Sequence, residues 1–226
     1  GYLYAGVTNR VSGAQVWRSS SGDNNTWSKV APATPGTEAA TITGFAVYGG
    51  ALHAAVESGG PAQLWRTDGG AWTTIVSDGF GSSTTTLTGG MAEMAGYLYV
   101  GAGDEVDGAQ LWRTVDETIW EPAIAAGFGD PNNQTVEAVF VFGHQLYASV
   151  KNVTTGIELW RSPDGADWVQ VNVDGFGDGN NSGSNRSHAV AGHLGNLYVG
   201  TANAVDGGEL WRMLEQQRIY LPLILR

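Results

Sequence analysis

The chain has 226 residues, 34 Gly, nine Trp and a formal net charge of −11, and it contains no cysteine. Only 15% of its side chains are charged, which excludes an ordinary helical protein and favours many short strands joined by tight turns. The acidic excess would repel phosphate groups and argues against a nucleic-acid partner, while the lack of cysteine excludes disulfides and thiolate metal sites.

The first predicted strand begins almost at once, at Leu3-Tyr4. No initiator Met or leader-like segment precedes it, so we expect either that a leader has been removed or that the chain is part of something longer. Further along, no apolar run approaches the roughly 20 residues that a membrane-spanning helix needs. A membrane span is therefore not expected.

A Trp-Arg pair recurs along the chain at intervals of 47 to 51 residues. Upstream of each pair lies a second strand-like segment, which carries Leu-Tyr or Leu-His at nearly the same period. Self-similarity at such a period indicates a repeat architecture, in which the recurring residues are structural. The five pairs are Trp17 and Arg18, Trp65 and Arg66, Trp112 and Arg113, Trp160 and Arg161, and Trp211 and Arg212.

Each complete copy is interpreted as four antiparallel strands, which in the fourth copy are Val136–Phe142, Leu146–Val150, Ile157–Arg161 and Trp168–Val173. A Gly-rich crossover, residues 175–181, follows them. Four strands per about 40 to 50 residues is typical of a β-propeller blade. We therefore predict an all-β fold, a single five-bladed β-propeller of four-stranded antiparallel blades. The blades, called repeats one to five below, span about residues 1–36, 37–82, 83–132, 133–183 and 184–226.

Repeats one and five depart from this pattern. No segment before Leu3 could form an inner strand, so blade one lacks its inner strand in this chain and keeps an open sheet edge. In repeat five, Tyr220-Leu-Pro222 aligns with Trp120-Glu-Pro122 of repeat three. That alignment predicts that the tail is an outer strand, where Pro is tolerated.

Three explanations of the missing strand stay open. The repeat could be imperfect, the strand could lie in residues absent from this chain, or a second chain could supply it by β-augmentation. The third explanation makes the apolar tail a candidate donor for assembly. Its residues are Ile219, Tyr220, Leu221, Leu223, Ile224 and Leu225.

The turn between the third and fourth strands of a repeat resembles the Asp-box, or BNR repeat, of sialidase-like propellers, whose motif is Ser-x-Asp-x-Gly-x-Thr-Trp. The nearest copy, 162–168, reads Ser-Pro-Asp-Gly-Ala-Asp-Trp and is one residue shorter, while repeat five lacks the Asp. The resemblance implies a structural turn in which the Asp accepts backbone N–H bonds and the Trp packs between blades. It does not choose between sialidases, glycan-binding propellers and non-enzymatic surface proteins.

A sialidase-like mechanism would need an arginine cluster, a tyrosine nucleophile with a supporting glutamate, and an acid/base aspartate. The Arg residues outside the pairs are scattered, at Arg10, Arg186, Arg218 and Arg226. Every Trp falls at a repeat position, those outside the pairs being Trp27, Trp72, Trp120 and Trp168. Repeated aromatic residues favour packing between blades over a unique sugar site. We therefore expect the fold without the catalytic residues.

Zinc is not expected, because the His residues lack a ligand spacing. The Gly-rich crossover offers a calcium candidate, since Asp174, Asp178 and Asn180 supply the hard oxygen donors that calcium prefers. Ordinary turns use the same residue types, so the other interpretation is that these residues only shape a turn and bind no metal. No other cofactor is expected.

Together these observations predict a non-catalytic structural or interaction propeller, secreted or displayed at a cell surface. It would self-associate by strand exchange into a homo-oligomer or a fibre, through the incomplete blade or the apolar tail. The alternative is a multivalent glycan-binding lectin with equivalent shallow sites between blades. A sialidase-like glycoside hydrolase is the third hypothesis, and it needs a carboxylate pair that the sequence does not reveal.

Overall fold

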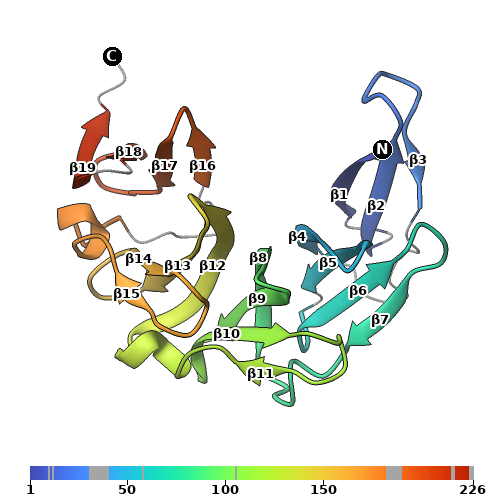
Figure 1. The fold of residues 1–226 in the computed structure, drawn as a ribbon, viewed down its shortest axis with the longest axis horizontal. Helices are drawn as coiled ribbons and strands as arrows, with labels where there is room; N and C mark the ends of the chain where they lie inside the picture. Colours follow the sequence, from blue (N-terminus) through green and yellow to red (C-terminus); the bar gives the residue numbers. More distant parts are fainter. Residues whose placement is uncertain are drawn as a thin grey trace. The chain divides into compact units, whose positions relative to one another are not determined.

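The computed structural model describes residues 1–9, 11, 13–30, 41–57, 59–104, 106–181, 190–214 and 217–223. Across these residues the chain is all-β, with strands β1 to β19 and two short 3-10 turns, η1 and η2 (Figure 1). It divides into two compact units, Gly1–Gly89 and Gly90–Arg226, and the boundary falls inside β8. Arg10, Arg186, Ile224, Leu225 and Arg226 lie outside the described residues.

The first unit contains two antiparallel sheets. The three-stranded sheet has the order β1 (Leu3–Asn9), β2 (Gly13–Ser19), β3 (Ser28–Lys29). The four-stranded sheet has the order β4 (Thr41–Tyr48), β5 (Ala51–Glu57), β6 (Gln63–Thr67), β7 (Thr73–Val76). β1 is therefore an edge strand, and no described strand occupies the inner position that the sequence predicts to be missing from repeat one.

The second unit contains an eight-stranded and a four-stranded sheet. One half of the larger sheet holds β8 (Thr86–Met94), β9 (Tyr97–Asp104), β10 (Gly108–Thr114) and β11 (Glu121–Pro122). The other half holds β12 (Asn133–Phe142), β13 (Gln145–Asn152), β14 (Glu158–Ser162) and β15 (Val169–Gln170). The halves pair through Thr135 and Gly103. The smaller sheet holds β16 (Val190–His193), β17 (Asn196–Thr201), β18 (Glu209–Leu214) and β19 (Gln217–Leu223).

The tail forms the outer strand of its own sheet, as its alignment with repeat three predicts. Pro222 of β19 lies opposite Trp211 of β18, and Pro122 of β11 lies opposite Trp112 of β10. Both prolines stand on outer strands, which need not donate every N–H to a neighbour. The sequence alignment therefore placed the register of the tail correctly.

The outer strand of repeat four is shorter than the predicted Trp168–Val173, because β15 covers only Val169–Gln170. Beyond it, the Val171 N–H still donates to the Leu159 carbonyl at 2.8 Å, and the Asn172 side chain then takes the place of a paired backbone. Its Oδ1 accepts the Leu159 N–H at 2.7 Å, and its Nδ2 donates to the Ile157 carbonyl at 3.0 Å. A side chain that satisfies backbone groups in this way ends the strand without leaving them unpaired.

The Gly-rich crossovers fold into tight turns, η1 (Ala126–Gly129) and η2 (Asp174–Gly177). In each turn a Gly-Phe pair adopts the left-handed conformation, with φ of +52° at Phe128 and +57° at Phe176. Phe rarely adopts this conformation, so packing must stabilise it. Phe128 lies 5.3 Å from the Trp160 ring, and Phe176 stacks on Trp211 at 4.8 Å. The crossovers thus deliver an aromatic ring to the Trp of the following repeat.

Three apolar clusters of described residues each join consecutive repeats. Ala14 and Val16 of repeat one pack with Ala54 and Val56 of repeat two. The second cluster joins Tyr99 and Leu111 of repeat three to Leu146, Ala148 and Val150 of repeat four. The third joins Tyr147 and Leu159 of repeat four to Leu197 and Val199 of repeat five. The core is therefore built from sheet faces that cover one another, as in a stacked repeat protein.

Candidate interaction surfaces

The turns between the third and fourth strands of repeats three and four are closed by a carboxylate. Asp164 Oδ1 accepts the N–H groups of Ala166 and Asp167, both at 2.9 Å, and these bonds lower the pKa of Asp164. In the same way, the N–H groups of Ile119 and Thr118 lower the pKa of Asp116 to about 2. Both carboxylates therefore serve turn geometry, which is the role that the Asp-box resemblance implies.

The turn of repeat four lies on a Tyr-Arg pair of repeat three. A Cβ added at Gly165 would stand 1.9 Å from the Tyr99 hydroxyl, and Arg113 Nη1 donates to the Gly165 carbonyl at 3.5 Å. Arg113 also pairs with Glu121 at 2.8 Å. Tyr99 is fully buried, and this burial raises the pKa of its hydroxyl. A tyrosine covered in this way is a docking surface for the next repeat rather than an accessible nucleophile.

A hydrogen bond that recurs in every repeat was not predicted from the sequence. Each Trp of the Trp-Arg pairs donates its indole N–H to the side chain two residues earlier, on the same face of the strand. The acceptors are Gln15 at 3.0 Å, Gln63 at 3.1 Å, Gln110 at 2.8 Å, Glu158 at 2.8 Å and Glu209 at 3.2 Å. In the sequence these acceptors form a series of Gln, Gln, Gln, Glu and Glu, each two residues before a Trp. This fixed spacing is the signal from which the repeated bond could have been predicted.

The predicted structural Trp and Arg residues are buried or half-buried, and Trp65, Trp72, Trp160 and Trp168 belong to the apolar clusters. Trp65 is buried, the other four Trp of the pairs are half-buried, and so are all five Arg. Trp27, Trp72, Trp120 and Trp168, which precede the outer strands, are half-buried too. Trp27 donates its indole N–H to the Gly22 carbonyl at 3.3 Å, inside its own turn.

The two Glu acceptors, Glu158 and Glu209, belong to clusters of amide and carboxylate side chains. Asn133 Nδ2 bonds Glu158 Oε2 at 2.8 Å and the Gly127 carbonyl at 3.0 Å. In the next repeat, Asn181 Nδ2 bonds Glu209 Oε2 at 2.7 Å and the Gly175 carbonyl at 2.9 Å. The buried Glu158 and the half-buried Glu209 are thus each held by an amide donor, and each cluster ties a crossover to the following repeat.

The three calcium candidates engage neighbouring amides. Asp178 Oδ1 accepts the Asn180 N–H at 2.9 Å, and Asp178 Oδ2 accepts from Asn203 Nδ2 at 2.8 Å. The Asn180 contact lowers the pKa of Asp178. Asp174 accepts from Gln170 at 2.6 Å. In the described residues, no group of three or more His, Asp or Glu side chains is arranged to hold a metal ion. Calcium binding at this loop stays a prediction.

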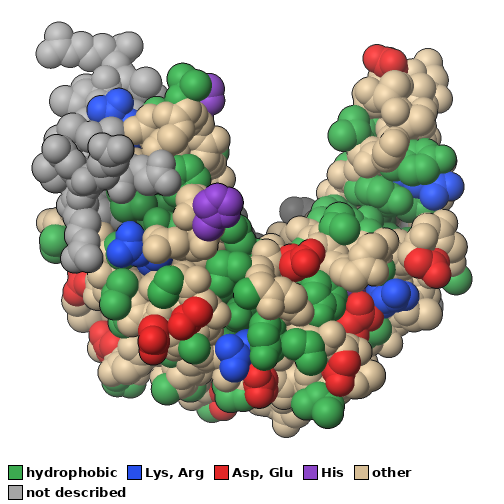
Figure 2. Space-filling view, in the orientation of Figure 1, with side chains coloured by type: hydrophobic (Ala, Val, Ile, Leu, Met, Phe, Trp, Pro, Cys, Tyr) green, Lys and Arg blue, Asp and Glu red, His purple; other side chains and the backbone are tan. Residues whose placement is uncertain are grey.

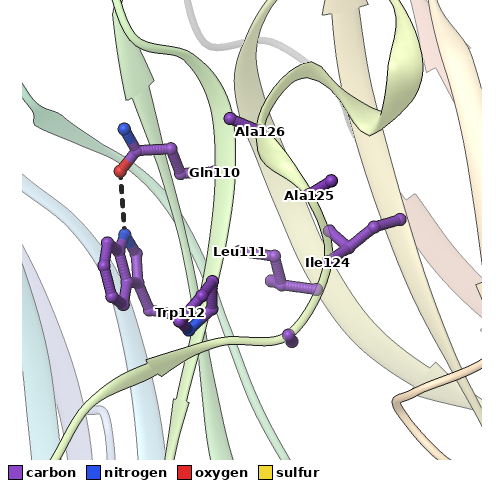
Figure 3. Close-up of a pocket in the computed structure, with 8 residues that line it drawn as sticks. Gln110, Leu111, Trp112, Ile124, Ala125 and Ala126 are labelled. Carbon is purple, nitrogen blue, oxygen red and sulfur yellow. Dashed lines mark hydrogen bonds between the residues drawn. The ribbon is translucent and has the colours of Figure 1, made fainter.

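A pocket of about 410 Å³ lies beside β10 and β11 in repeat three (Figure 3). Figure 3 shows Gln110 and Trp112 on one side of β10 and Leu111 on the other. Small side chains line its far wall, at Ala123, Ala125 and Ala126. Repeat four carries Val171, Val173 and Asp174 at the equivalent positions. The pocket therefore follows from residues that repeat four does not share.

The first sheet has an exposed apolar face next to its open edge. Residues directly opposite each other in an antiparallel pair share a face, and Ala5 lies opposite Trp17. Leu3, Ala5, Val7 and Trp17 consequently lie on one face. The opposite face holds Val16, which packs on repeat two. Leu3 is 53% exposed and Val7 is 41% exposed, so this strand combines accessible apolar side chains with an edge that pairs with no other described strand.

The assembly candidates in the tail are only partly described. Ile219, Tyr220, Leu221 and Leu223 belong to β19 and so pair with β18 of the same chain. Arg218 lies in the same strand. Donation of this segment to another chain stays a prediction.

Charged side chains are dispersed on the face drawn in Figure 2, where Asp and Glu are scattered among polar and apolar residues instead of gathering into one patch. Across the part of the chain that the structure describes, no helix has the length and apolar character needed to cross a membrane.

No family model matches the chain, and no curated protein matches it by sequence. Solved structures with a similar fold exist. A prolyl endopeptidase matches at 10% identity and a TM-score of 0.64, over 98% of this chain and 33% of its own. Trypanosoma rangeli sialidase bound to 2,3-difluorosialic acid matches at 12% identity and a TM-score of 0.59, over 97% and 42%. An α-L-arabinofuranosidase of Clostridium thermocellum matches at 15% identity and a TM-score of 0.52, over 94% and 85%.

These matches support a sialidase-like β-propeller fold. At such identities the likeness shows the fold alone. The chain spans a third of the endopeptidase chain and less than half of the sialidase chain. The number of blades stays a prediction.

Proposed function

We propose that this protein is a non-catalytic extracellular interaction propeller that self-associates through its incomplete first repeat. The observation that carries this proposal is the open edge of β1, which pairs with β2 and with no other described strand. An unpaired edge presents N–H and C=O groups to any strand that can align with it. The exposed Leu3 and Val7 side chains add apolar surface to that edge.

The other described sheets offer no spare inner strand to complete β1. The strands β4, β8, β12 and β16 are already paired with β5, β9, β13 and β17. A strand beside β1 must therefore come from another molecule or from a segment outside these sheets. We assign this strand to a second copy of the protein, because every copy presents the same open edge to its neighbours in solution.

Two observations favour a role without catalysis. The Tyr99 hydroxyl, which lies beside an arginine, is buried against Gly165 and has no access to a substrate. The turn carboxylates Asp116 and Asp164 are held by backbone N–H groups. The glycan-binding alternative requires equivalent sites in several repeats, whereas the pocket beside Trp112 depends on small residues of repeat three.

The test is the solution mass of the protein by light scattering over a wide concentration range. We expect oligomers or longer assemblies in the wild type. Val7→Lys places a charge on the edge strand and should weaken association by about tenfold or more. Val141→Lys is the matched control, because Val141 has nearly the same exposure, 43%, on β12, which lies between β9 and β13 in its sheet.

A wild-type protein that stays monomeric at every concentration would overturn the proposal. Equal effects of the two lysine variants would overturn it as well. A synthetic peptide of residues 217–226 tests the predicted donor, since it should compete with assembly if the tail is the added strand and should have no effect otherwise.

A further inference from the structure

The pocket of repeat three and the equivalent place in repeat four have the same backbone bond on one side. In repeat three the Ala123 N–H, just beyond the outer strand, donates to the Leu111 carbonyl at 2.7 Å. In repeat four the Val171 N–H donates to the Leu159 carbonyl at 2.8 Å. The third and fourth strands of the two repeats therefore keep the same register up to this bond.

The next residue along the chain makes the two repeats different. In repeat four, Asn172 Oδ1 accepts the Leu159 N–H at 2.7 Å. The equivalent residue of repeat three is Ile124, whose side chain has no acceptor atom. The N–H and C=O of one residue in an antiparallel strand point toward the same neighbour, so the Leu111 N–H faces this position. The pairing of β10 with β11 does not extend to Leu111, and among the described residues its N–H has no hydrogen-bond acceptor.

This unpaired donor borders the pocket of about 410 Å³. Leu111, Ala123 and Ile124 all line the pocket, and Figure 3 shows the Ile124 side chain beside Leu111. The residues that line it all belong to the second unit, and none of them is charged. Its volume lies in the range of small-molecule sites, about 300 to 1,000 Å³. The pocket thus combines apolar walls with one N–H group that needs a partner, since a buried N–H left unpaired costs about 1 to 3 kcal/mol.

We propose that this pocket binds a small neutral molecule that carries a carboxamide group on an apolar body. The carbonyl oxygen of the ligand accepts the Leu111 N–H, as the amide oxygen of Asn172 accepts the Leu159 N–H in repeat four. A neutral ligand fits because the lining is uncharged and because a net charge of −11 repels anions. The inference goes beyond the proposed self-association, since no residue of β1 lines this pocket.

The experiment titrates benzamide into the full chain labelled with ¹⁵N and follows the backbone amides by NMR. The Leu111 amide proton should move downfield and reach a plateau, because it gains an oxygen acceptor. Its exchange with solvent should slow by about tenfold when free benzamide stands at ten times its dissociation constant. Both effects are expected at Leu111 and not at Leu159, whose N–H is already bonded.

Three variants test the site. Ile124→Asn places the amide of repeat four beside Leu111 and should weaken benzamide binding by about tenfold or more. Ile119→Asn makes the same change on an exposed turn outside the pocket; it is the matched control and should bind like the wild type. Ala125→Leu fills the pocket from an exposed position and should also weaken binding by about tenfold or more, so the test stands even if Ile124→Asn does not fold.

Three results would overturn the proposal. The first is a Leu111 amide that does not respond to benzamide at any concentration, because water would then satisfy it. The second is strong protection of that amide from exchange before benzamide is added, since the donor would already have a partner. The third is equal affinity of the wild type and the folded Ala125→Leu variant. Light scattering of the same samples keeps the two proposals apart, because a monomeric wild type that binds benzamide would refute the self-association alone.

Discussion

Strands β13 and β1 have the same pattern of residues and different surroundings. Leu146, Ala148 and Val150 of β13 pack against repeat three and are fully buried. In β1 the equivalent Leu3 and Val7 are exposed, and among the described strands β1 pairs with β2 alone. The difference teaches that this face of a strand becomes core where an apolar face of another repeat packs against it. The predictions below test this comparison.

The largest effect is expected at the turn that closes the junction of repeats three and four. Gly165→Val places a branched side chain at a φ of +80° and against the Tyr99 hydroxyl, and we expect a loss of about 4 kcal/mol in the free energy of unfolding. Gly177→Val is the matched control, since Gly177 also has a positive φ but open space around its Cβ. That variant should lose about 1 to 2 kcal/mol. Urea unfolding followed by Trp fluorescence measures both, and equal losses would refute the role of the Tyr99 contact.

The second-largest effect is expected at Leu146, and Leu3 is the equivalent residue with which it is compared. Leu146→Ala opens a cavity in a closed interface, and we expect a loss of about 3 kcal/mol. Leu3→Ala trims a side chain that is already 53% exposed, so the loss should stay below about 0.5 kcal/mol in dilute solution. The same urea titrations measure both variants. A loss at Leu3 as large as that at Leu146 would mean that the first face is covered even in dilute solution.

The smallest effect concerns pH. The N–H bonds from Ile119 and Thr118 lower the pKa of Asp116 from 3.8 to about 2, so its contribution to stability is present above pH 3.8 and is lost as the pH falls toward 2. Asp116→Asn keeps an oxygen acceptor and removes the titration. The unfolding midpoint of this variant should therefore depend less steeply on pH between about 4 and 2. Asp206→Asn, on an exposed turn, is the control, and a wild-type slope in both variants would contradict the prediction.

Much of the local structure could be predicted from the sequence, because its causes lie within a repeat. The Trp-Arg pairs marked one strand of each repeat, and the likeness of Pro222 to Pro122 predicted that the tail forms an outer strand. The end of β15 could not be foreseen, because it depends on an Asn172 side chain reaching two backbone groups of β14. The indole bonds were not predicted, because the acceptor two residues before each Trp changes from Gln to Glu along the chain.

The candidate interaction surfaces were likewise only partly predictable from the sequence. The sequence by itself determined that Trp recurs at a fixed period and that the fold is all-β. Only the tertiary structure decided that Tyr99 lies under Gly165, that the crossover Phe rings meet the Trp of the next repeat, and that Leu3 and Val7 are left exposed. The physical reason is that strand patterns depend on neighbours along the chain, whereas burial depends on which face another repeat covers.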